Sequence, residues 1–243
     1  MRSFWARMSH SQSGSRGLVR AVGAAMVIGL VSTIAAQAGD PCAKGDLNQV
    51  RVDHRTLSLM WTGTIGNGMH EKIEAEFDKA KDGIKRVDLY LNSCGGSIRE
   101  MEATIASLRR VKKTHRLETA VGWAHECASA CVPIFLQGQS RYGALTSNWL
   151  FHEAGREEFE PVGRPPDKVT VSNEVTERVF NDYYIPAGVS KRWLDRVRGL
   201  IKNQDYFQTG EDLVKDESHI ITDPLDNVVP RDEVEGKRII GDF

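Results

Sequence analysis

The chain has 243 residues, of which 40% are hydrophobic and 27% are charged, and its formal net charge is −1. This length and composition suit a globular protein with a sizeable hydrophobic core. The near-neutral charge, with no clustered basic face, argues against a nucleic-acid-binding protein.

The first 38 residues have the layout of a targeting segment. They carry four arginines and no acid, then an apolar stretch over 21–36, and finally the small-x-small site Ala36-Gln37-Ala38. The apolar stretch is short for a membrane span, which needs about 20 residues. We therefore expect residues 1–38 to be an export signal. The alternative is an uncleaved N-terminal anchor that associates the protein with a membrane. Removal of the segment leaves 39–243, with a net charge of −5, as one expected domain.

The first half of this domain alternates predicted strands and helices. The pattern predicts strands over 56–65, 87–91 and 117–123, and helices from Met69 to about Gly83, from the capping box Ser97-Ile-Arg-Glu100 onward, and from Ser129 onward. A glycine-rich turn over 92–97 separates the second strand from the second helix. This alternation is typical of an α/β fold with largely parallel strand pairing.

The second half has shorter elements. We expect strands over 141–144, 149–152, 206–208 and 220–221, a polar excursion loop over 153–168, helices over 168–184 and 190–201, and a helix cap at Thr209-Gly-Glu-Asp212.

Four cysteines, Cys42, Cys94, Cys127 and Cys131, fall in the expected exported part. An even number in an exported chain favours disulfides, and three pairings are possible. Helical spacing would place the Cα atoms of Cys127 and Cys131 about 6 Å apart, so we favour that pair and, less directly, Cys42 with Cys94. The rival hypothesis is a zinc site that includes His125, but it lacks further ligands, and we expect no metal and no cofactor.

Ser129 follows a predicted strand and opens an apolar helix. Its simplest interpretation is a helix N-cap. A serine in this position also suits a nucleophile, because unpaired backbone N–H groups there can stabilise an oxyanion. Such a nucleophile needs a base, a group that orients the base, and oxyanion donors.

Four ordered blocks resemble the proteolytic subunit of the Clp protease, in the Clp/crotonase superfamily. They are Val87-Asp-Leu-Tyr-Leu-Asn-Ser-Cys-Gly-Gly-Ser-Ile98, Cys127-Ala-Ser-Ala130, Arg141-Tyr-Gly-Ala-Leu-Thr-Ser-Asn-Trp-Leu-Phe-His152 and Asp205-Tyr-Phe-Gln-Thr-Gly-Glu-Asp-Leu213. The resemblance covers about residues 55–225. It implies a spiral of strand-strand-helix units with a largely parallel sheet, and a homo-oligomer.

The resemblance also implies a Ser-His-Asp triad, with Ser129 as nucleophile, His152 as general base and Asp205 as orienting carboxylate. Backbone N–H groups of Gly96 and Ala130 would be the oxyanion donors. Rival residues are His125 as base and, as acids, Asp195, Glu211 and Asp212. The sequence departs from the family at Cys94, which replaces a proline, and at Cys127 and Cys131, which flank the serine.

We therefore expect an exported, ATP-independent serine peptidase that hydrolyses peptides or unfolded chains. The main alternative is a catalytically inactive binding or assembly protein of the periplasm with the same fold. Two further alternatives are another acyl chemistry, such as thioester hydrolysis, and a serine–lysine dyad that uses Lys191 or Lys202.

Overall fold

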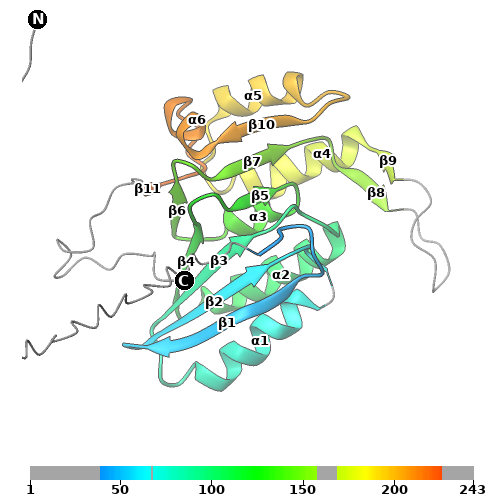
Figure 1. Cartoon of the computed structure of the whole chain (residues 1–243). Helices are drawn as coiled ribbons and strands as arrows, with labels where there is room; N and C mark the ends of the chain where they lie inside the picture. The colour runs from blue at the N-terminus through cyan, green and yellow to red at the C-terminus, as the bar shows by residue number, and fades with distance from the viewer. Residues whose placement is uncertain (1–38, 67, 158–168, 226–243) are drawn as a thin grey trace, which may run out of the picture. The chain divides into compact units, whose positions relative to one another are not determined.

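The computed structural model describes residues 39–66, 68–157 and 169–225 (Figure 1). These residues all belong to the second of two units of the chain, Ala36–Phe243. The expected export signal, residues 1–38, lies outside the described residues. Within them, no helix is long and apolar enough to cross a membrane.

A six-stranded sheet forms the first part of the fold, in the order β1-β2-β3-β4-β6-β11 (Figure 1). Its strands are β1 (Asp46–Asp53), β2 (Thr56–Thr62), β3 (Arg86–Asn92), β4 (Arg116–Val121), β6 (Ser140–Ala144) and β11 (Asp223–Leu225). Only β1 pairs antiparallel, and the other neighbours pair parallel. The prediction of an α/β fold with a largely parallel sheet is therefore confirmed.

A three-stranded sheet continues the fold in the order β10-β7-β5. It contains β5 (Glu126–Ala128), β7 (Asn148–Phe151) and β10 (Tyr206–Thr209). β5 runs parallel to β7, whereas β10 runs antiparallel to it. A separate antiparallel pair joins β8 (Gly155–Glu157) to β9 (Val169–Val171).

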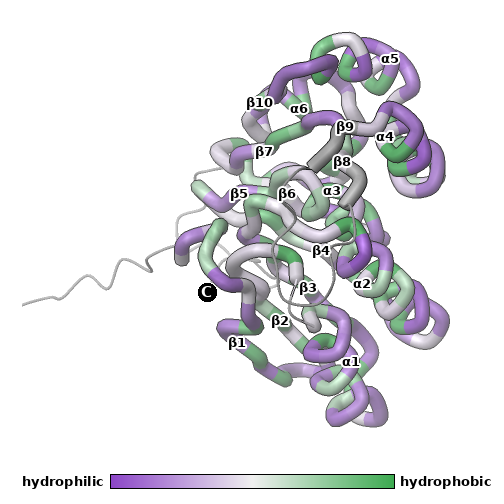
Figure 2. The backbone as a smooth tube through the Cα atoms, turned by 90° about the vertical axis from the view of Figure 1, so that its right-hand side faces the viewer, coloured by the Kyte–Doolittle hydropathy of each residue, from purple (hydrophilic) through white to green (hydrophobic). Residues whose placement is uncertain are grey.

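Helices pack against the sheets through apolar faces. They are α1 (Met69–Ala80), α2 (Ile98–Val111), α3 (Cys131–Phe135), α4 (Asn173–Val179), α5 (Lys191–Leu200) and α6 (Gly210–Lys215), with a π-helical segment η1 (Phe180–Tyr184) after α4. Hydrophilic and hydrophobic residues alternate along α1, α2 and α5 (Figure 2). In α2 the predicted apolar residues Met101, Ile105 and Leu108 are buried, as the 3.6-residue period requires.

Several element predictions were wrong in detail. The helix expected from Ser129 begins at Cys131, after the unpredicted strand β5. The helix expected from 168 begins at Asn173, because 169–171 form β9 and pair with part of the expected loop. No strand forms at 220–221 in the described chain, and the last strand is Asp223–Leu225. The edge strand β1 was also missed, since its residues are mostly exposed and lack apolar alternation.

The capping box predicted at the start of α2 is only half present. Ser97 caps the helix by accepting the Glu100 N–H. The carboxylate of Glu100 instead accepts the backbone N–H of His70 at 2.9 Å and bonds the His70 ring at 2.7 Å. It therefore joins α2 to the first turn of α1. At Thr209 and Asp212 the predicted cap is a complete capping box.

Two valines of the six-stranded sheet provide a matched test of this core. Val87 in β3 is fully buried, whereas Val52 in β1 is 58% exposed. We expect Val87→Ala to lower the free energy of unfolding by about 2 to 3 kcal/mol, because it removes buried methyl groups and leaves a cavity. Val52→Ala should change it by less than about 0.5 kcal/mol. Urea denaturation of both variants measures the difference, and equal effects would contradict the described packing.

Candidate active site

Ser129 lies in the turn between β5 and α3 and has a φ of 52°. The helix cap is Ala130, so the interpretation of Ser129 as an N-cap is wrong. A positive φ is costly for a residue with a Cβ and often marks a functional site. It is not diagnostic alone, because other non-glycine residues of the described chain share it. Ser129 differs from them in lining a cavity.

That cavity has a volume of about 280 Å³ and collects residues from distant parts of the sequence. Ser129 and His152 both line it, as do Gly96 and Ala130. Its walls are largely apolar and include Met101 of α2, Leu150 of β7, and Phe180 and Tyr184 of η1. π-Helical segments often occur at functional sites, and here one supplies two aromatic side chains to the wall.

The Gly95–Gly96 turn lies directly against the serine. Gly95 has a φ of 96°, and a Cβ added to it would lie 2.8 Å from Ser129 Cβ and 2.9 Å from the Ala128 carbonyl oxygen. An added Cβ on Gly96 would collide with the carbonyl oxygen of Ile65. Only glycine allows both the backbone conformation and this close approach.

Hydrogen bonds hold this turn in register with the serine turn. Ser93 donates its N–H to the Glu126 carbonyl at 2.7 Å and accepts the Ala128 N–H at 2.9 Å. The Ser93 hydroxyl accepts the Gly95 N–H at 3.1 Å. The segment that leads from β3 to the two glycines thus pairs with β5, which leads to Ser129.

Two backbone donors remain available at the cavity. In the part of the chain that the structure describes, neither the N–H of Gly96 nor that of Ala130 has a recorded protein acceptor. Both residues line the cavity. Unpaired N–H groups directed at a common site are what stabilisation of an oxyanion requires.

His152 directly follows β7, and its ring Nδ1 lies 2.7 Å from the Glu153 carbonyl oxygen. A carbonyl only accepts, so Nδ1 carries the proton and the neutral ring keeps its lone pair on Nε2. Nε2 is the atom that a general base needs to have free. Across the described residues, no hydrogen bond joins Ser129 to His152, although such contacts often form only with substrate.

Asp205 lies one residue before β10, and His152 lies one residue after β7. The antiparallel register between these strands ends with Tyr206 opposite Phe151. A continuation of that register would place Asp205 opposite His152, on the same side of the sheet. Asp205 is exposed, does not line the cavity and, within the described ranges, has no recorded hydrogen bond to His152.

The rival residues are engaged elsewhere. Burial lowers the pKa of His125, which does not line the cavity. Asp195 binds Lys191 and Arg198, Asp212 caps α6, and Glu211 binds Lys215. Lys202 is exposed and is not part of the cavity wall.

Two disulfides flank the site: Cys127 with Cys131, and Cys42 with Cys94. The first closes the turn around Ser129, but from strand to helix rather than along one helix as we expected. Since its two cysteines are joined to each other, they do not provide the thiolate ligands of the rival zinc hypothesis.

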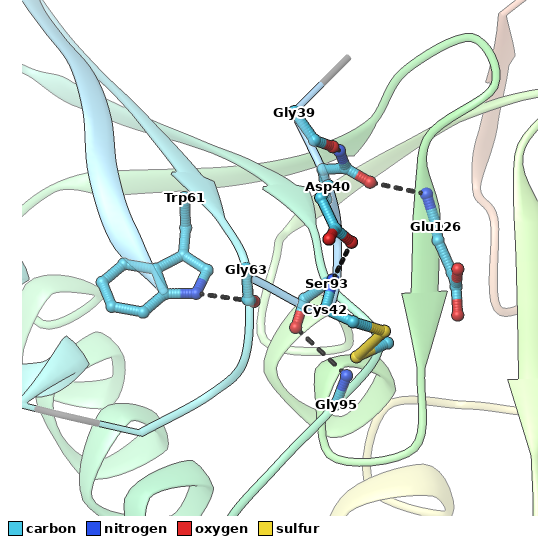
Figure 3. The surroundings of a disulfide bond; sticks show 10 residues. Gly39, Asp40, Cys42, Trp61, Gly63, Ser93, Gly95 and Glu126 are labelled. Atoms are coloured by element: carbon cyan, nitrogen blue, oxygen red, sulfur yellow. Dashed lines mark hydrogen bonds between the residues drawn. A yellow bond between two sulfur atoms is a disulfide. The ribbon is translucent and has the colours of Figure 1, made fainter. Parts of the chain in front are cut away.

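The second disulfide attaches residues 39–45 to the glycine turn (Figure 3). Backbone bonds reinforce it, since the Cys94 N–H donates to the Pro41 carbonyl and the Thr64 N–H donates to the Ala43 carbonyl. The Asn92 side chain also donates to the Gly39 carbonyl at 2.8 Å. The predicted pairing of Cys42 with Cys94 is confirmed. The backbone bonds around it were not predicted, because residues 39–45 have no periodic pattern that would reveal them.

Comparison with known proteins supports the fold. No protein-family model matches the chain, and no curated protein matches it. Among solved structures, the catalytic domain of the ClpP protease from Plasmodium falciparum is 15% identical, with a TM-score of 0.50, and the match covers 73% of this chain and 88% of that one. A membrane-bound stomatin-specific protease, 1510-N, is 14% identical, with a TM-score of 0.51 and coverage of 69% and 77%. ClpP1 from Listeria monocytogenes is 13% identical, with a TM-score of 0.45 and coverage of 71% and 92%.

The first two likenesses, together with the mixed sheet, show a Clp/crotonase-like α/β fold, as the sequence resemblance predicted.

Gly95 and Gly188 provide a test of the close contact at Ser129. Both have positive φ, but an added Cβ meets Ser129 only at Gly95 and meets nothing within 4 Å at Gly188. Gly188→Ala should cost about 1 kcal/mol of stability from backbone strain alone. Gly95→Ala should cost more, because it also displaces the serine turn. Chemical denaturation compares them, and equal losses would contradict the contact.

The disulfides should contribute unequally to stability. The Cys127–Cys131 loop spans 4 residues and the Cys42–Cys94 loop spans 52. Chain entropy gives about 2 kcal/mol for the short loop and about 4 kcal/mol for the long one. Double alanine variants of each pair, unfolded in urea without reductant, measure both values. A larger loss from the Cys127/Cys131 variant would contradict this ordering.

Proposed function

We propose that this protein is an exported serine peptidase that hydrolyses peptides or unfolded chains without ATP. The observation that carries the proposal is that Ser129, His152, Gly96 and Ala130 line one and the same cavity. A strained serine, a histidine and two unpaired N–H groups are the components of acyl transfer.

The proposed chemistry assigns a role to each group. His152 Nε2 accepts the Ser129 hydroxyl proton as the oxygen attacks the peptide carbonyl. The N–H groups of Gly96 and Ala130 stabilise the resulting oxyanion, and the protonated imidazole then donates its proton to the leaving amine. Water hydrolyses the acyl-enzyme by the same steps in reverse order. Asp205, the acid of the proposed triad, stabilises the imidazolium.

The lining of the cavity supports a peptide substrate, and the two disulfides support an exported location. The apolar wall formed by Met101, Phe180 and Tyr184 suits a nonpolar substrate side chain. Two disulfides suit an oxidising compartment, which agrees with the predicted export signal. The two solved structures with the higher TM-scores both carry the name protease. Assembly into a homo-oligomer and membrane association through residues 1–38 stay predictions.

One observation favours the second candidate, a binding protein without catalysis. Among the described residues, Asp205 has no recorded bond to the His152 ring, so the acid of the expected triad is not engaged. If the site has lost its activity, Ser129→Ala will leave peptide binding and the biological role unchanged.

Labelling of Ser129 separates these two candidates. We expect a fluorophosphonate probe to label the oxidised, folded protein at Ser129, because the reaction requires an activated serine. Ser129→Ala should abolish labelling, and His152→Ala should slow it by about 10²- to 10⁴-fold through loss of the general base.

Ser140→Ala is the matched control, since Ser140 lies on β6 and does not line the cavity. Mass spectrometry identifies the labelled residue. No adduct at Ser129 in folded, oxidised protein would contradict the proposal.

A further inference from the structure

We propose that Glu153 is a positioning residue that connects the base His152 to the turn that carries Asp205. The inference deepens the proposed function and rests on it. Glu153 was expected to belong to a polar excursion loop, but it is half-buried and makes contacts in two directions.

The first contact fixes the histidine. The Glu153 carbonyl accepts the proton of His152 Nδ1 at 2.7 Å. An imidazole Nδ1 carries one proton, so this bond selects the tautomer with a free Nε2. In a Ser-His-Asp triad a carboxylate makes this contact. Here a main-chain oxygen makes it, and the histidine is held ready for base catalysis independently of Asp205.

The second contact fixes the opposite strand. The Glu153 carboxylate accepts the Asn203 N–H through Oε2 at 2.8 Å, although the two residues are 50 positions apart. Asn203 has a φ of 59° and lies in the turn between α5 and β10. A bond from a carboxylate to a backbone N–H is about twice as strong as a neutral one. The bond therefore stabilises this turn, in which Asn203 adopts a left-handed conformation that asparagine tolerates.

Together the two contacts of Glu153 join the segments that extend beyond the end of the β7–β10 pair. The β7–β10 ladder ends at Phe151 and Tyr206, immediately before His152 and Asp205. Beyond that end, the recorded bond between the two segments is the one from Asn203 to Glu153. Without it, His152 and Asp205 would extend from frayed strand ends. Glu153 thus fixes the turn that precedes β10, and with it the segment of Asp205, relative to the base His152.

Two substitutions of Glu153 distinguish its role in positioning from the effect of its negative charge. Glu153→Gln keeps an oxygen that accepts the Asn203 N–H but removes the charge, whereas Glu153→Ala removes the acceptor. The control is Glu211→Ala, which removes an exposed carboxylate paired with Lys215 on α6. Activity is measured as peptide hydrolysis, and amide hydrogen exchange at Asn203 is measured on the same proteins.

We expect kcat of Glu153→Ala to fall about 10- to 100-fold with KM unchanged, because small displacements of a base are costly. Asn203 should exchange faster in this variant. Glu153→Gln should restore most of kcat and the slow exchange, and Glu211→Ala should match the wild type. An unchanged kcat together with unchanged Asn203 exchange in Glu153→Ala would overturn the proposal. Equal losses in the Ala and Gln variants would also overturn it, because charge and not position would then matter.

The exchange measurement and the ¹⁵N shifts of the His152 ring need no catalysis. If Ser129 fails to label but Nδ1 is protonated and Asn203 is protected by Glu153, the proposed function fails and the positioning role stands. If labelling succeeds but Nε2 carries the proton in the neutral ring, the positioning role fails and the peptidase stands.

Discussion

The arrangement of the site depends on the pairing of β5, β7 and β10. The Ser129 N–H donates to the Leu150 carbonyl at 2.9 Å, which extends the β5–β7 pairing directly into the serine turn. The antiparallel β7–β10 register then places Tyr206 opposite Phe151, the residues next to Asp205 and His152. Ser129 and His152, which are distant in sequence, thus reach the cavity through one short sheet, because backbone ladders fix register far more strictly than loops do.

Packing on the buried side of this sheet holds it in place. Phe135 stacks edge-to-face on Trp149, and Phe151 stacks on Trp193, with centroids 4.9 and 5.0 Å apart. Trp193 donates its ring N–H to Gln208 of β10 at 3.1 Å, so even the polar side chain on that face is paired. Side chains alternate along a strand, so Leu150 lies on the face opposite Trp149 and Phe151. Leu150, Phe151 and His152 all line the cavity.

The glycine turn reaches the same cavity by a different route. It extends from the parallel sheet through Asn92 and Ser93, which bond to β5. The Asn92 side chain has two roles there, since its oxygen accepts the Glu126 N–H and its amide donates to Gly39. Residues 39–45 and the Cys42–Cys94 disulfide then cover this junction (Figure 3). These contacts hold the glycine turn against the serine turn and so hold Gly96 near Ala130, whose N–H groups are the proposed oxyanion donors. Preorganised donors cost no reorganisation during reaction.

Much of this architecture could be predicted from the sequence. Alternation and helical period located β2, β3, α1 and α2, because their apolar residues recur at a regular spacing. The short strand β5 was missed, because three residues carry no measurable period. The role of Glu153 was missed for another reason: its carboxylate binds a backbone N–H, and such a partner has no sequence signature. The sequence also did not reveal that Ser129 lies outside the helix, since a positive φ at a non-glycine residue is imposed by tertiary contacts.

The central claim is that Ser129, His152 and the N–H groups of Gly96 and Ala130 surround one reacting centre. A crystal structure with a peptide boronate tests it most directly. We predict a covalent bond from boron to the Ser129 oxygen. A boronate oxygen should lie about 2.7–3.1 Å from the backbone nitrogens of both Gly96 and Ala130, and His152 Nε2 should contact the adduct. A boronate bound elsewhere, or joined to Ser129 with its oxygens directed away from Gly96 and Ala130, would contradict the claim.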